Sequence, residues 1–505
     1  MTITLQNTEK GQCYAVKFDR YRQQVVDKLK SSVSIRWWDK QTGAWLIPAT
    51  NKCKAELDQL TYYVRHFEPV QWGTVAQLQT EEDVAFQIPE MPELDGDHGL
   101  KVQPYPYQLQ GIARGLQLKR FINGDDMGLG KSLESIATIN KADAFPCLVI
   151  CPNVVKINWQ REWHKFTDKK AMVLTDSVRD SWPFFWQTGM NQVFIVNYES
   201  LRKYFVRRIT KAEKWTLKDV EFHNTIKLFK SVIIDESHKV KSTATQQTKF
   251  CKGIASGKEY IILLTGTPVV NKPKDLVAQL GIMDRMIDMG GWKGFMLRYC
   301  SGPNQASNLK ELNYRLWKHC FFRREKSKVL TQLPDKVRQI VSCEITNRKE
   351  YMDAERDLID YLKRYKEADD EKIQKSLKGE VMVRIGILKD ITARGKLKEV
   401  IDFVKDFREN GKKIILFCNL HEIVDRLMIA FPSAVCVTGR QNMQEKQASV
   451  DAFQKNPKTD VIICSIKAAS AGITLTAASD VAFIELPWTY ADCDQAESRA
   501  HRIGQ

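Results

Sequence analysis

The stretch that decides the fold of this chain is Asp126-Met127-Gly128-Leu129-Gly130-Lys131-Ser132. Glycines let successive backbone N–H groups turn toward an anion at the N-terminus of a helix, and a lysine beside them reaches the β- and γ-phosphates of a nucleotide. Gly128, Gly130 and Lys131 satisfy this requirement, and the Ser132 hydroxyl offers a ligand to Mg²⁺. The stretch predicts a phosphate-binding loop, although Asp125 stands where the general motif has its first glycine.

A second acidic motif, Asp235-Glu236-Ser237-His238, follows the apolar run Val232-Ile233-Ile234. A carboxylate at the end of a strand near a phosphate loop can hold Mg²⁺ through its water shell, while its neighbour orients the attacking water. We assign Asp235 to the metal and Glu236 to the water. The alternative is an acidic turn that merely ends a core strand.

Two arginines near the end of the chain, Arg499 and Arg502, are three residues apart, a spacing that places them on one face of a helix. A positioned arginine neutralises charge on the γ-phosphate and accelerates phosphoryl transfer by roughly 10³- to 10⁵-fold where this has been measured. Alone, such a pair usually forms a solvated face. A phosphate loop completed by distant arginines predicts hydrolysis coupled to motion between two domains.

Around these motifs, short apolar runs alternate with helical stretches. Such runs are typical of parallel strands buried on both faces, and they predict two βαβ-type domains. The first set comprises residues 146–150, 192–196, 231–234 and 260–264, and the second comprises residues 413–417, 434–437, 460–463 and 481–484.

The segment before the first α/β domain is compact and aromatic. We expect a strand at residues 14–18, a helix at 21–29, and a hairpin of residues 35–38 and 44–48 that turns at Thr42-Gly43. Between His66 and Lys101 the chain has eight acidic residues and no Lys or Arg, which predicts a linker.

A helical insertion is expected between the two α/β domains. Residues 335–378 contain no Gly or Pro, and Tyr351, Leu358, Leu362 and Tyr365 recur at helical spacing. This pattern indicates a core-facing stripe better than a cofactor site.

The charge of the chain favours a polyanionic partner, since the formal net charge is +16 and the pI is near 9.1. A soluble basic enzyme without such a partner is the alternative. Residues 202–230 carry nine Lys or Arg against three acidic residues, and Arg323-Arg324-Glu325-Lys326 is a second basic segment, so both are candidates for contact with a DNA backbone.

Other features of the composition limit the location of the protein. The 12 cysteines lack zinc-site spacing and are expected to be reduced and metal-free. No apolar stretch approaches the roughly 20 residues of a membrane span, and the first residues lack a secretory pattern. We expect an intracellular protein without membrane contact, with a bacterial or phage-infected cytoplasm favoured over the nucleus.

The ordered set of motifs resembles superfamily 2 helicases, and within them the SWI/SNF-related ATPases, which translocate on double-stranded DNA. This resemblance implies two RecA-like domains, ATP and Mg²⁺ as cofactors, and DNA as partner. It also implies that Gln108 reads the adenine edge, that Gly472 joins residues 126–132 in binding the nucleotide, and that His238, Thr265, Thr267 and Gln495 couple the ATP site to DNA. The motifs are Tyr107-Gln108, Asp126–Ser132, Asp235–His238, Leu264-Thr265-Gly266-Thr267-Pro268, Ser470–Leu475 and Gln495–Gln505.

Within that group, the chain is similar to the annealing helicases that remodel stalled forks. Ser237 takes the place more often filled by Ala, and residues 14–60 resemble a HARP domain with its Arg36-Trp37-Trp38-Asp39 and Gly43-Ala44-Trp45 hairpin. The core of a small sheet is the favoured explanation of the three tryptophans. An exposed one could stack on bases, which makes the N-terminal domain a candidate for single-stranded DNA.

We therefore predict an α/β protein with two RecA-like parallel-sheet domains and helical insertions, preceded by a small α+β domain. The expected function is a DNA-stimulated ATPase that moves on duplex or branched DNA and remodels or anneals it, as in DNA repair, with a monomer favoured. The alternatives are a strand-separating DNA or RNA helicase and a nucleotide-dependent switch acting on a protein–DNA complex. Related motors continue past the last motif, so we expect either a truncation after Gln505 or an unusually short protein. The predicted domains are residues 1–66, 67–100 (linker), 101–285, 286–390 (helical insertions) and 391–505.

Overall fold

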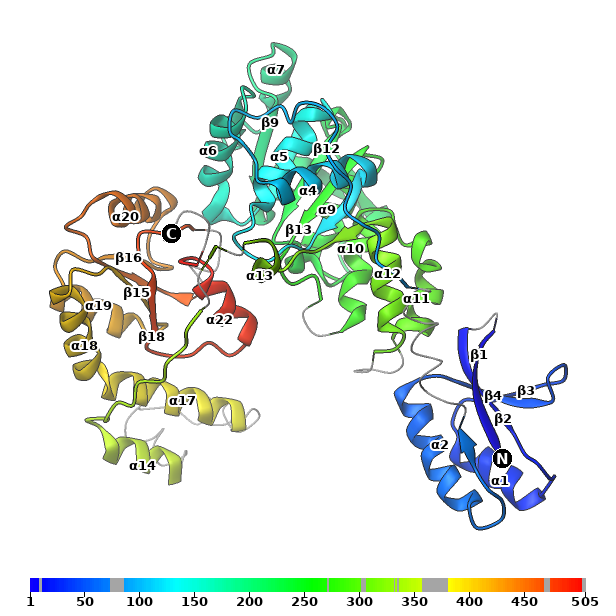
Figure 1. The fold of residues 1–505 in the computed structure, drawn as a ribbon. Helices are drawn as coiled ribbons and strands as arrows, with labels where there is room; N and C mark the ends of the chain where they lie inside the picture. The colour runs from blue at the N-terminus through cyan, green and yellow to red at the C-terminus, as the bar shows by residue number, and fades with distance from the viewer. Residues whose placement is uncertain are drawn as a thin grey trace. The chain divides into compact units, whose positions relative to one another are not determined.

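The computed structural model describes residues 1–8, 11–72, 86–269, 272–300, 306–330, 332–333, 336–356, 380–466 and 473–501 (Figure 1). The chain divides into two compact units. Residues 1–97, 109–124 and 201–322 form the first unit, and residues 98–108, 125–200 and 323–505 form the second. Among the described helices, none is both long and apolar enough to cross a bilayer.

The N-terminal part of the first unit is a five-stranded sheet with the order β3-β4-β2-β1-β5. The predicted strand and hairpin are confirmed as β2 (Gly11–Lys17), β3 (Trp37–Asp39) and β4 (Ala44–Pro48), and Gly43 has φ +60° in the turn. The strands β1 (Thr2–Thr8) and β5 (Gln71–Trp72) are additional to the prediction, and β5 lies inside the predicted linker.

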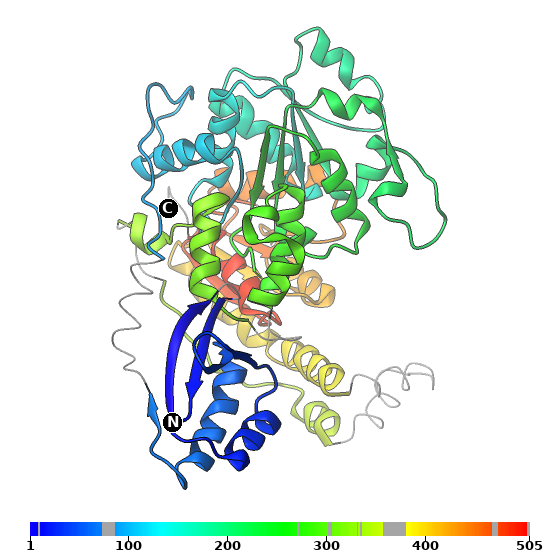
Figure 2. The same ribbon diagram turned by 90° about the vertical axis from the view of Figure 1, so that its right-hand side faces the viewer.

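Two helices cover this sheet, α1 (Gln23–Ser32), as predicted, and α2 (Asn51–Val64), as Figures 1 and 2 show. Leu29 and Leu57 of the helices share one apolar core with Val16 and Ile47 of the strands, which explains why the segment can form a layered α+β domain. Of the three tryptophans, Trp37 and Trp45 are partly buried in apolar clusters, whereas Trp38 is 50% exposed. The core interpretation is therefore confirmed for Trp37 and Trp45, and Trp38 is an exposed tryptophan whose stacking on bases stays a prediction.

A seven-stranded sheet follows, with the order β14-β6-β13-β12-β7-β9-β8. In the first unit β12 (Ser231–Asp235), β13 (Tyr260–Leu264), β6 (Arg120–Asn123) and β14 (Phe321–Phe322) form parallel pairs. In the second unit β9 (Val193–Asn197) pairs in parallel with β7 (Cys147–Cys151) and β8 (Ala171–Val173).

All four predicted strands of this domain are confirmed as β7, β9, β12 and β13. Every residue of β7, β9 and β13 is buried, as expected where helices cover both faces of a parallel sheet. The strands β6, β8 and β14 are too short for a recognisable apolar run, and β14 lies within the predicted helical insertion. The helices of this part are α4 (Pro106–Leu118), α5 (Lys131–Lys141), α6 (Lys156–Phe166), α7 (Trp182–Gln187), α8 (Leu201–Phe205), α9 (Gln246–Ala255) and α10 (Leu276–Ile282).

The second unit also holds a four-stranded parallel sheet with the order β16-β17-β15-β18. Its strands are β15 (Ile414–Phe417), β16 (Val435–Val437), β17 (Val461–Cys464) and β18 (Asp480–Phe483), which confirms the second predicted set. Separate apolar clusters lie on its two faces. The fold class is thus as predicted, two RecA-like parallel sheets after a small α+β domain. Its helices are α18 (Leu397–Glu409), α19 (His421–Ala430), α20 (Met443–Lys455) and α22 (Tyr490–Glu497).

Apart from the short helix at residues 326–329, four helices are described within residues 286–395. They are α11 (Gly291–Tyr299), α12 (Leu309–His319), α14 (Arg348–Arg356) and α17 (Glu380–Gly395). Tyr351 packs against a small core formed by Ala354 and Ile391, as the stripe predicts. Leu358, Leu362 and Tyr365 lie outside the described residues.

Candidate nucleotide-binding site

The phosphate loop has the backbone that its glycines predict. Gly128 and Gly130 have φ values of +88° and +89°, in the left-handed region that other residues avoid. Gly130 immediately precedes α5, and a Cβ added to it would lie 2.3 Å from Nε2 of Gln108. The loop therefore places its backbone at the N-terminus of a helix, where the helix dipole and unpaired N–H groups favour a phosphate.

Lys131 lies against the carbonyl groups of its own loop. Its Nζ donates hydrogen bonds to the carbonyl oxygens of Asp125, at 2.7 Å, and Asp126, at 3.2 Å. Phosphate oxygens are stronger, charged acceptors for an ammonium group. A bound nucleotide would therefore draw Lys131 from these carbonyls toward its phosphates.

Two side chains of α4 support the loop from behind. Nε2 of Gln108 and the hydroxyl of Tyr107 both donate to the carbonyl oxygen of Leu129, at 3.0 and 2.9 Å. Both residues are buried. Burial, followed by the charge of Glu134, raises the pKa of Tyr107, so this hydroxyl remains a donor. In this structure Gln108 positions the loop, and its reading of adenine stays a prediction.

The departure from the general motif at Asp125 has a structural reason that the motif alone does not reveal. Asp125 is fully buried, and Arg324 donates to its carboxylate, to Glu134 of α5 and to the carbonyl oxygen of Tyr107. Burial lowers the pKa of Arg324, but the charges of Glu134 and Asp125 outweigh it and raise the pKa. The expectation that Arg324 touches DNA is wrong, because this guanidinium is only 8% exposed and holds both ends of the loop.

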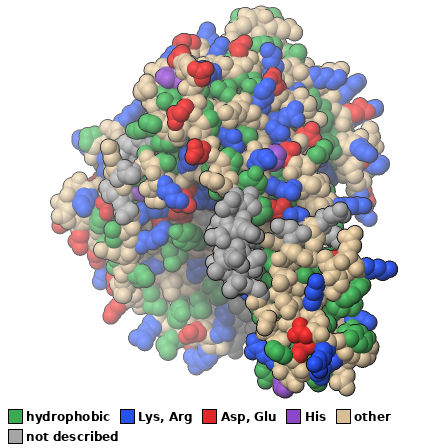
Figure 3. All heavy atoms as spheres, turned by 45° about the vertical axis from the view of Figure 1, so that its right-hand side comes forward, with side chains coloured by type: hydrophobic (Ala, Val, Ile, Leu, Met, Phe, Trp, Pro, Cys, Tyr) green, Lys and Arg blue, Asp and Glu red, His purple; other side chains and the backbone are tan. Residues whose placement is uncertain are grey.

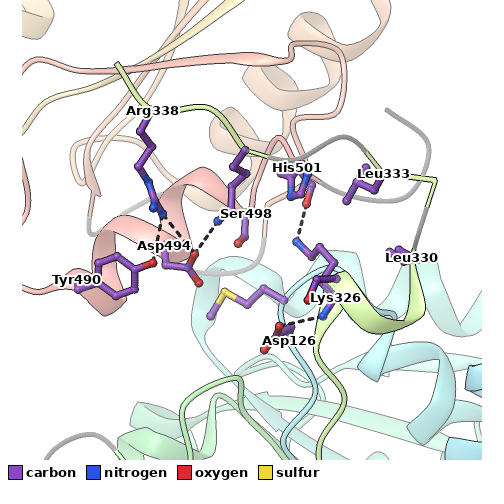
Figure 4. Close-up of a pocket in the computed structure, with 12 residues that line it drawn as sticks. Asp126, Lys326, Leu330, Leu333, Arg338, Tyr490, Asp494, Ser498 and His501 are labelled. Atoms are coloured by element: carbon purple, nitrogen blue, oxygen red, sulfur yellow. Dashed lines mark hydrogen bonds and ion pairs between the residues drawn. The ribbon is translucent and has the colours of Figure 1, made fainter. Parts of the chain in front are cut away.

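Asp126 is held by the other residues of the same basic segment. Its carboxylate accepts hydrogen bonds from Nη2 of Arg323 and from the backbone N–H of Lys326, both at 3.0 Å. Lys326 begins α13 (Lys326–Val329), and its Nζ donates to the carbonyl oxygen of His501 at 2.8 Å (Figure 4). The cationic residues of this segment therefore bind the phosphate loop and the region after α22.

The predicted hydrolytic and coupling residues of the first unit form one connected group. Glu236 follows β12 with φ +53°, an unfavourable conformation for a non-glycine residue. Nδ1 of His238 lies 3.3 Å from Oε2 of Glu236 and 3.2 Å from Oγ1 of Thr265. The backbone N–H of Thr267 also donates to Oγ1 of Thr265, at 3.1 Å. Asp235 is joined to the group through its carboxylate, which accepts from the N–H of Glu236 at 2.9 Å.

A buried glutamine completes this group. It belongs to none of the sequence motifs and could not be predicted from them. Gln279 is fully buried, accepts a hydrogen bond from the Ser237 hydroxyl at 2.8 Å, and donates to the carbonyl oxygen of Pro268 at 2.8 Å. It therefore ties the acidic motif to the Leu264–Pro268 motif.

The arginine motif differs from its predicted helical form. The helix α22 ends at Glu497, so Arg499 lies in the turn that follows it, where its carbonyl oxygen accepts from the N–H of Leu475 at 3.0 Å. Arg499 is 2% exposed, and Gln495 is also buried, on the last turn of α22. The shared helical face of Arg499 and Arg502 is thus not observed for Arg499, and Arg502 and Gly472 lie outside the described residues.

A cavity of about 270 Å³ lies between the phosphate loop and α22 in the second unit. Figure 4 shows Asp126 and Lys326 on one side, Tyr490 and Asp494 on the other, and His501 above Lys326. Because the turn bearing Arg499 joins this wall, the structure brings the arginine motif close to the start of the loop. Among the described residues there is no group of three or more potential metal ligands. Mg²⁺ needs only one or two protein ligands when phosphates and waters supply the rest, which is compatible with this finding, and the assignment of Ser132 and Asp235 to the metal stays a prediction.

Comparisons with known proteins add independent findings. Residues 107–392 match the SNF2-related domain family, and residues 395–504 match the helicase conserved C-terminal domain family. A Caenorhabditis elegans homolog of SWI/SNF-related matrix-associated actin-dependent regulator of chromatin subfamily A-like protein 1 is 27% identical over 98% of this chain and 70% of its own length. The mouse DNA annealing helicase and endonuclease ZRANB3 is 31% identical over 80% of this chain and 38% of its own length.

Among solved structures, the Sulfolobus solfataricus SWI2/SNF2 ATPase core in complex with dsDNA has a TM-score of 0.41 and 24% identity. The match covers 82% of this chain and 88% of that one.

Proposed function

Because this chain belongs to the SNF2-related family and is an ATP-hydrolysing, helicase-like enzyme, we propose that it uses ATP hydrolysis to move along duplex or branched DNA and to remodel or anneal it. The observation that best supports this proposal is the shared cavity of the phosphate loop and the arginine motif. A site built from two distant segments can respond to relative motion of the segments, which a simple nucleotide-binding loop does not require.

Each residue of the site has a chemical role in this proposal. Lys131 neutralises the β- and γ-phosphates, while Ser132 and Asp235 would hold Mg²⁺, which would offset the charge of the phosphates. Glu236 orients the attacking water. Arg499 and Arg502 stabilise the charge that develops on the γ-phosphate during transfer.

The connected group in the first unit provides a route from hydrolysis to DNA. Glu236 contacts His238, and His238 contacts Thr265, which in turn fixes the backbone at Thr267. A change at the γ-phosphate that moves Glu236 is thus transmitted to the Leu264–Pro268 motif. We propose that this motif and Gln495 report the nucleotide state to the bound DNA.

The site assignment is tested with the variants Lys131→Ala and Glu236→Gln. We expect each to lower DNA-stimulated ATP turnover by about 10²-fold or more, because each removes a group that acts directly on the reacting phosphate or water. The matched controls are Lys405→Ala and Glu259→Gln, whose side chains are more than half exposed and form ion pairs with the surface residues Asp402 and Lys119. Near-normal turnover in either site variant, with circular dichroism confirming the fold of all four proteins, contradicts the assignment.

The DNA transaction is tested by comparing ATPase stimulation with duplex DNA, forked DNA, single strands and RNA, and by ATP-dependent displacement of a triplex strand. We expect the strongest stimulation from duplex or forked DNA, and displacement only with ATP. Preference for RNA contradicts the proposal in favour of a strand-separating helicase, and absence of displacement with ATP favours a nucleotide-dependent switch.

A further inference from the structure

One continuous segment contacts both the phosphate loop and α22. We call residues 323–338 the strap, of which residues 331, 334 and 335 lie outside the described part. At one end Arg323, Arg324 and Lys326 bind the loop residues Asp125 and Asp126. The strap therefore starts at the site where the nucleotide phosphates are proposed to bind.

The other end of the strap binds the polar face of α22. Nζ of Lys336 lies 2.6 Å from Oδ1 of Asp494, and Arg338 donates to both carboxylate oxygens of Glu497, at 2.9 and 2.7 Å. The Arg338 guanidinium also lies over the ring of Tyr490 (Figure 4). Burial raises the pKa of Glu497, but hydrogen bonds from Arg338 and Lys336 outweigh it and lower the pKa, so the carboxylate stays ionised near neutral pH.

Lys326 is the residue of the strap that joins the two sides directly. Its backbone N–H donates to Oδ2 of Asp126, and its Nζ donates to the carbonyl oxygen of His501. His501 is two residues beyond Arg499, and its own N–H bonds to the end of α22. A single residue, through its backbone N–H and its side chain, thus joins the first residue of the phosphate loop to the turn that carries the buried arginine.

We infer that Lys326 is a positioning residue for the hydrolytic reaction, which holds the Arg499 turn in register with the phosphate loop. The inference rests on the proposed function. It adds to that function a residue that contacts neither ATP nor DNA. A lysine suits this role because its flexible four-carbon stem can follow small movements of the turn while one of its three donors keeps the carbonyl. Lys326 acts through Arg499, since displacing a catalytic group by about 1 Å can cost about 10²-fold in rate.

Lys328 provides a matched control on the same short helix. Its side chain is 73% exposed, and within the described part of the chain its ion pair is with Glu325 at 3.1 Å, a surface pair that contributes little. The variants Lys326→Met and Lys328→Met remove the same charge from the same helix. Unlike Lys328, Lys326 is partly buried, lines the cavity and donates to the carbonyl oxygen of His501.

The experiment compares wild type, Lys326→Met, Lys326→Arg and Lys328→Met in duplex-stimulated ATP hydrolysis. We expect Lys326→Met to lower kcat about 10- to 100-fold while the KM for ATP changes by less than about threefold, since the ground-state contacts of the nucleotide are retained. Lys326→Arg keeps a cationic donor and should restore most of the kcat. Lys328→Met should match wild type.

A double-mutant cycle with Arg499→Ala tests whether Lys326 acts through the arginine. If it does, Lys326→Met lowers kcat far less in the Arg499→Ala background than in wild type. Equal losses in both backgrounds, a kcat equal to that of Lys328→Met, or a loss confined to KM overturns the inference. Wild type without any DNA-stimulated turnover overturns the proposed function instead, so the two failures are distinguishable.

Discussion

Among single residues, Arg324 determines how an unusual phosphate loop is stabilised. The loop has Asp125 where a glycine is usual, and a buried, unpaired carboxylate would cost several kcal/mol. Arg324, which is distant from the loop in the sequence, neutralises the Asp125 carboxylate. It also binds Glu134 on the helix that follows the loop. The loop, its helix and α4 are consequently held by one guanidinium.

The variant Arg324→Met tests this role. We expect it to destabilise the second unit by about 3–5 kcal/mol, because it leaves Asp125 and Glu134 buried without their cation. Differential scanning calorimetry measures the effect as a change in melting temperature. The relevant transition is the one whose melting temperature shifts when ATP is added. Arg323→Met is the control, because Arg323 is 45% exposed and its ion pair with Asp126 is screened by solvent. Equal melting temperatures for the two variants would show that Arg324 does not clamp the loop.

Among the secondary-structure elements, the basic segment 202–230 forms a structured hairpin. The strands β10 (Val206–Ile209) and β11 (Val220–Phe222) are antiparallel, and Arg208 binds Glu221 through two hydrogen bonds of 2.7 Å. A backbone hydrogen bond from Thr216, then the side chains of Lys211 and Thr216, lower the pKa of Asp219 to about 2. Two of the three acidic residues of the segment, Asp219 and Glu221, therefore already bind cations within the hairpin.

The tip of this hairpin is fixed to α9. Trp215 stacks on Phe250 at 5.6 Å between ring centroids, and Nζ of Lys249 donates to the carbonyl oxygen of Trp215 at 2.8 Å. The exposed cations Arg207, Lys214 and Lys218 are thus presented by an ordered element. Figure 3 shows that Lys and Arg side chains are spread over the visible face of the molecule, so local order matters more than charge alone in choosing a DNA contact.

We expect the triple variant Arg207→Ala, Lys214→Ala, Lys218→Ala to bind duplex DNA more weakly. The log–log dependence of affinity on salt should become shallower by about 0.9 for each phosphate that the variant no longer neutralises. Fluorescence anisotropy over a salt series measures both effects. The charge-swapped pair Arg208→Glu with Glu221→Arg preserves net charge and the ion pair, and should leave the slope unchanged. An unaltered slope in the triple variant means that the hairpin is only a solvated face.

Within the whole molecule, the N-terminal sheet has an apolar core of its own. Strands and helices of residues 1–72 share this cluster, and the prediction that they form a separate domain rests on it. Trp38 is half exposed and contacts the edge of Trp45, with ring centroids 5.4 Å apart. We propose that it stacks on an unpaired base, whereas the resemblance to a HARP domain stays a prediction.

Deletion of residues 1–72 should leave duplex-stimulated ATP turnover largely intact but remove any added stimulation by forks with single-stranded arms. Trp38→Ala in the full chain should weaken fork binding by about 1–3 kcal/mol if one base stacks on it. Tyr62→Ala is the control, because this aromatic is 72% exposed on α2 and contacts His66. Equal fork affinities for the two aromatic variants contradict base stacking by Trp38.

Features that depend on local chemistry could be predicted from the sequence. The glycines and lysine of Asp126–Ser132 required a phosphate loop before a helix, and apolar runs such as 231–234 and 260–264 required buried parallel strands. Short elements such as β6 and β14 escaped prediction, because two to four residues cannot establish a period.

By contrast, the three-dimensional fold decides which charged side chains contact each other. Arg323, Arg324 and Lys326 resemble a DNA-binding run in the sequence, yet they are committed to carboxylates and a carbonyl about 175 to 200 residues away along the chain. Likewise, the spacing of Arg499 and Arg502 indicated a helical face, but α22 ends at Glu497. Both differences arise because packing and burial in three dimensions set the partner of a side chain, whereas a motif records only its neighbours along the chain.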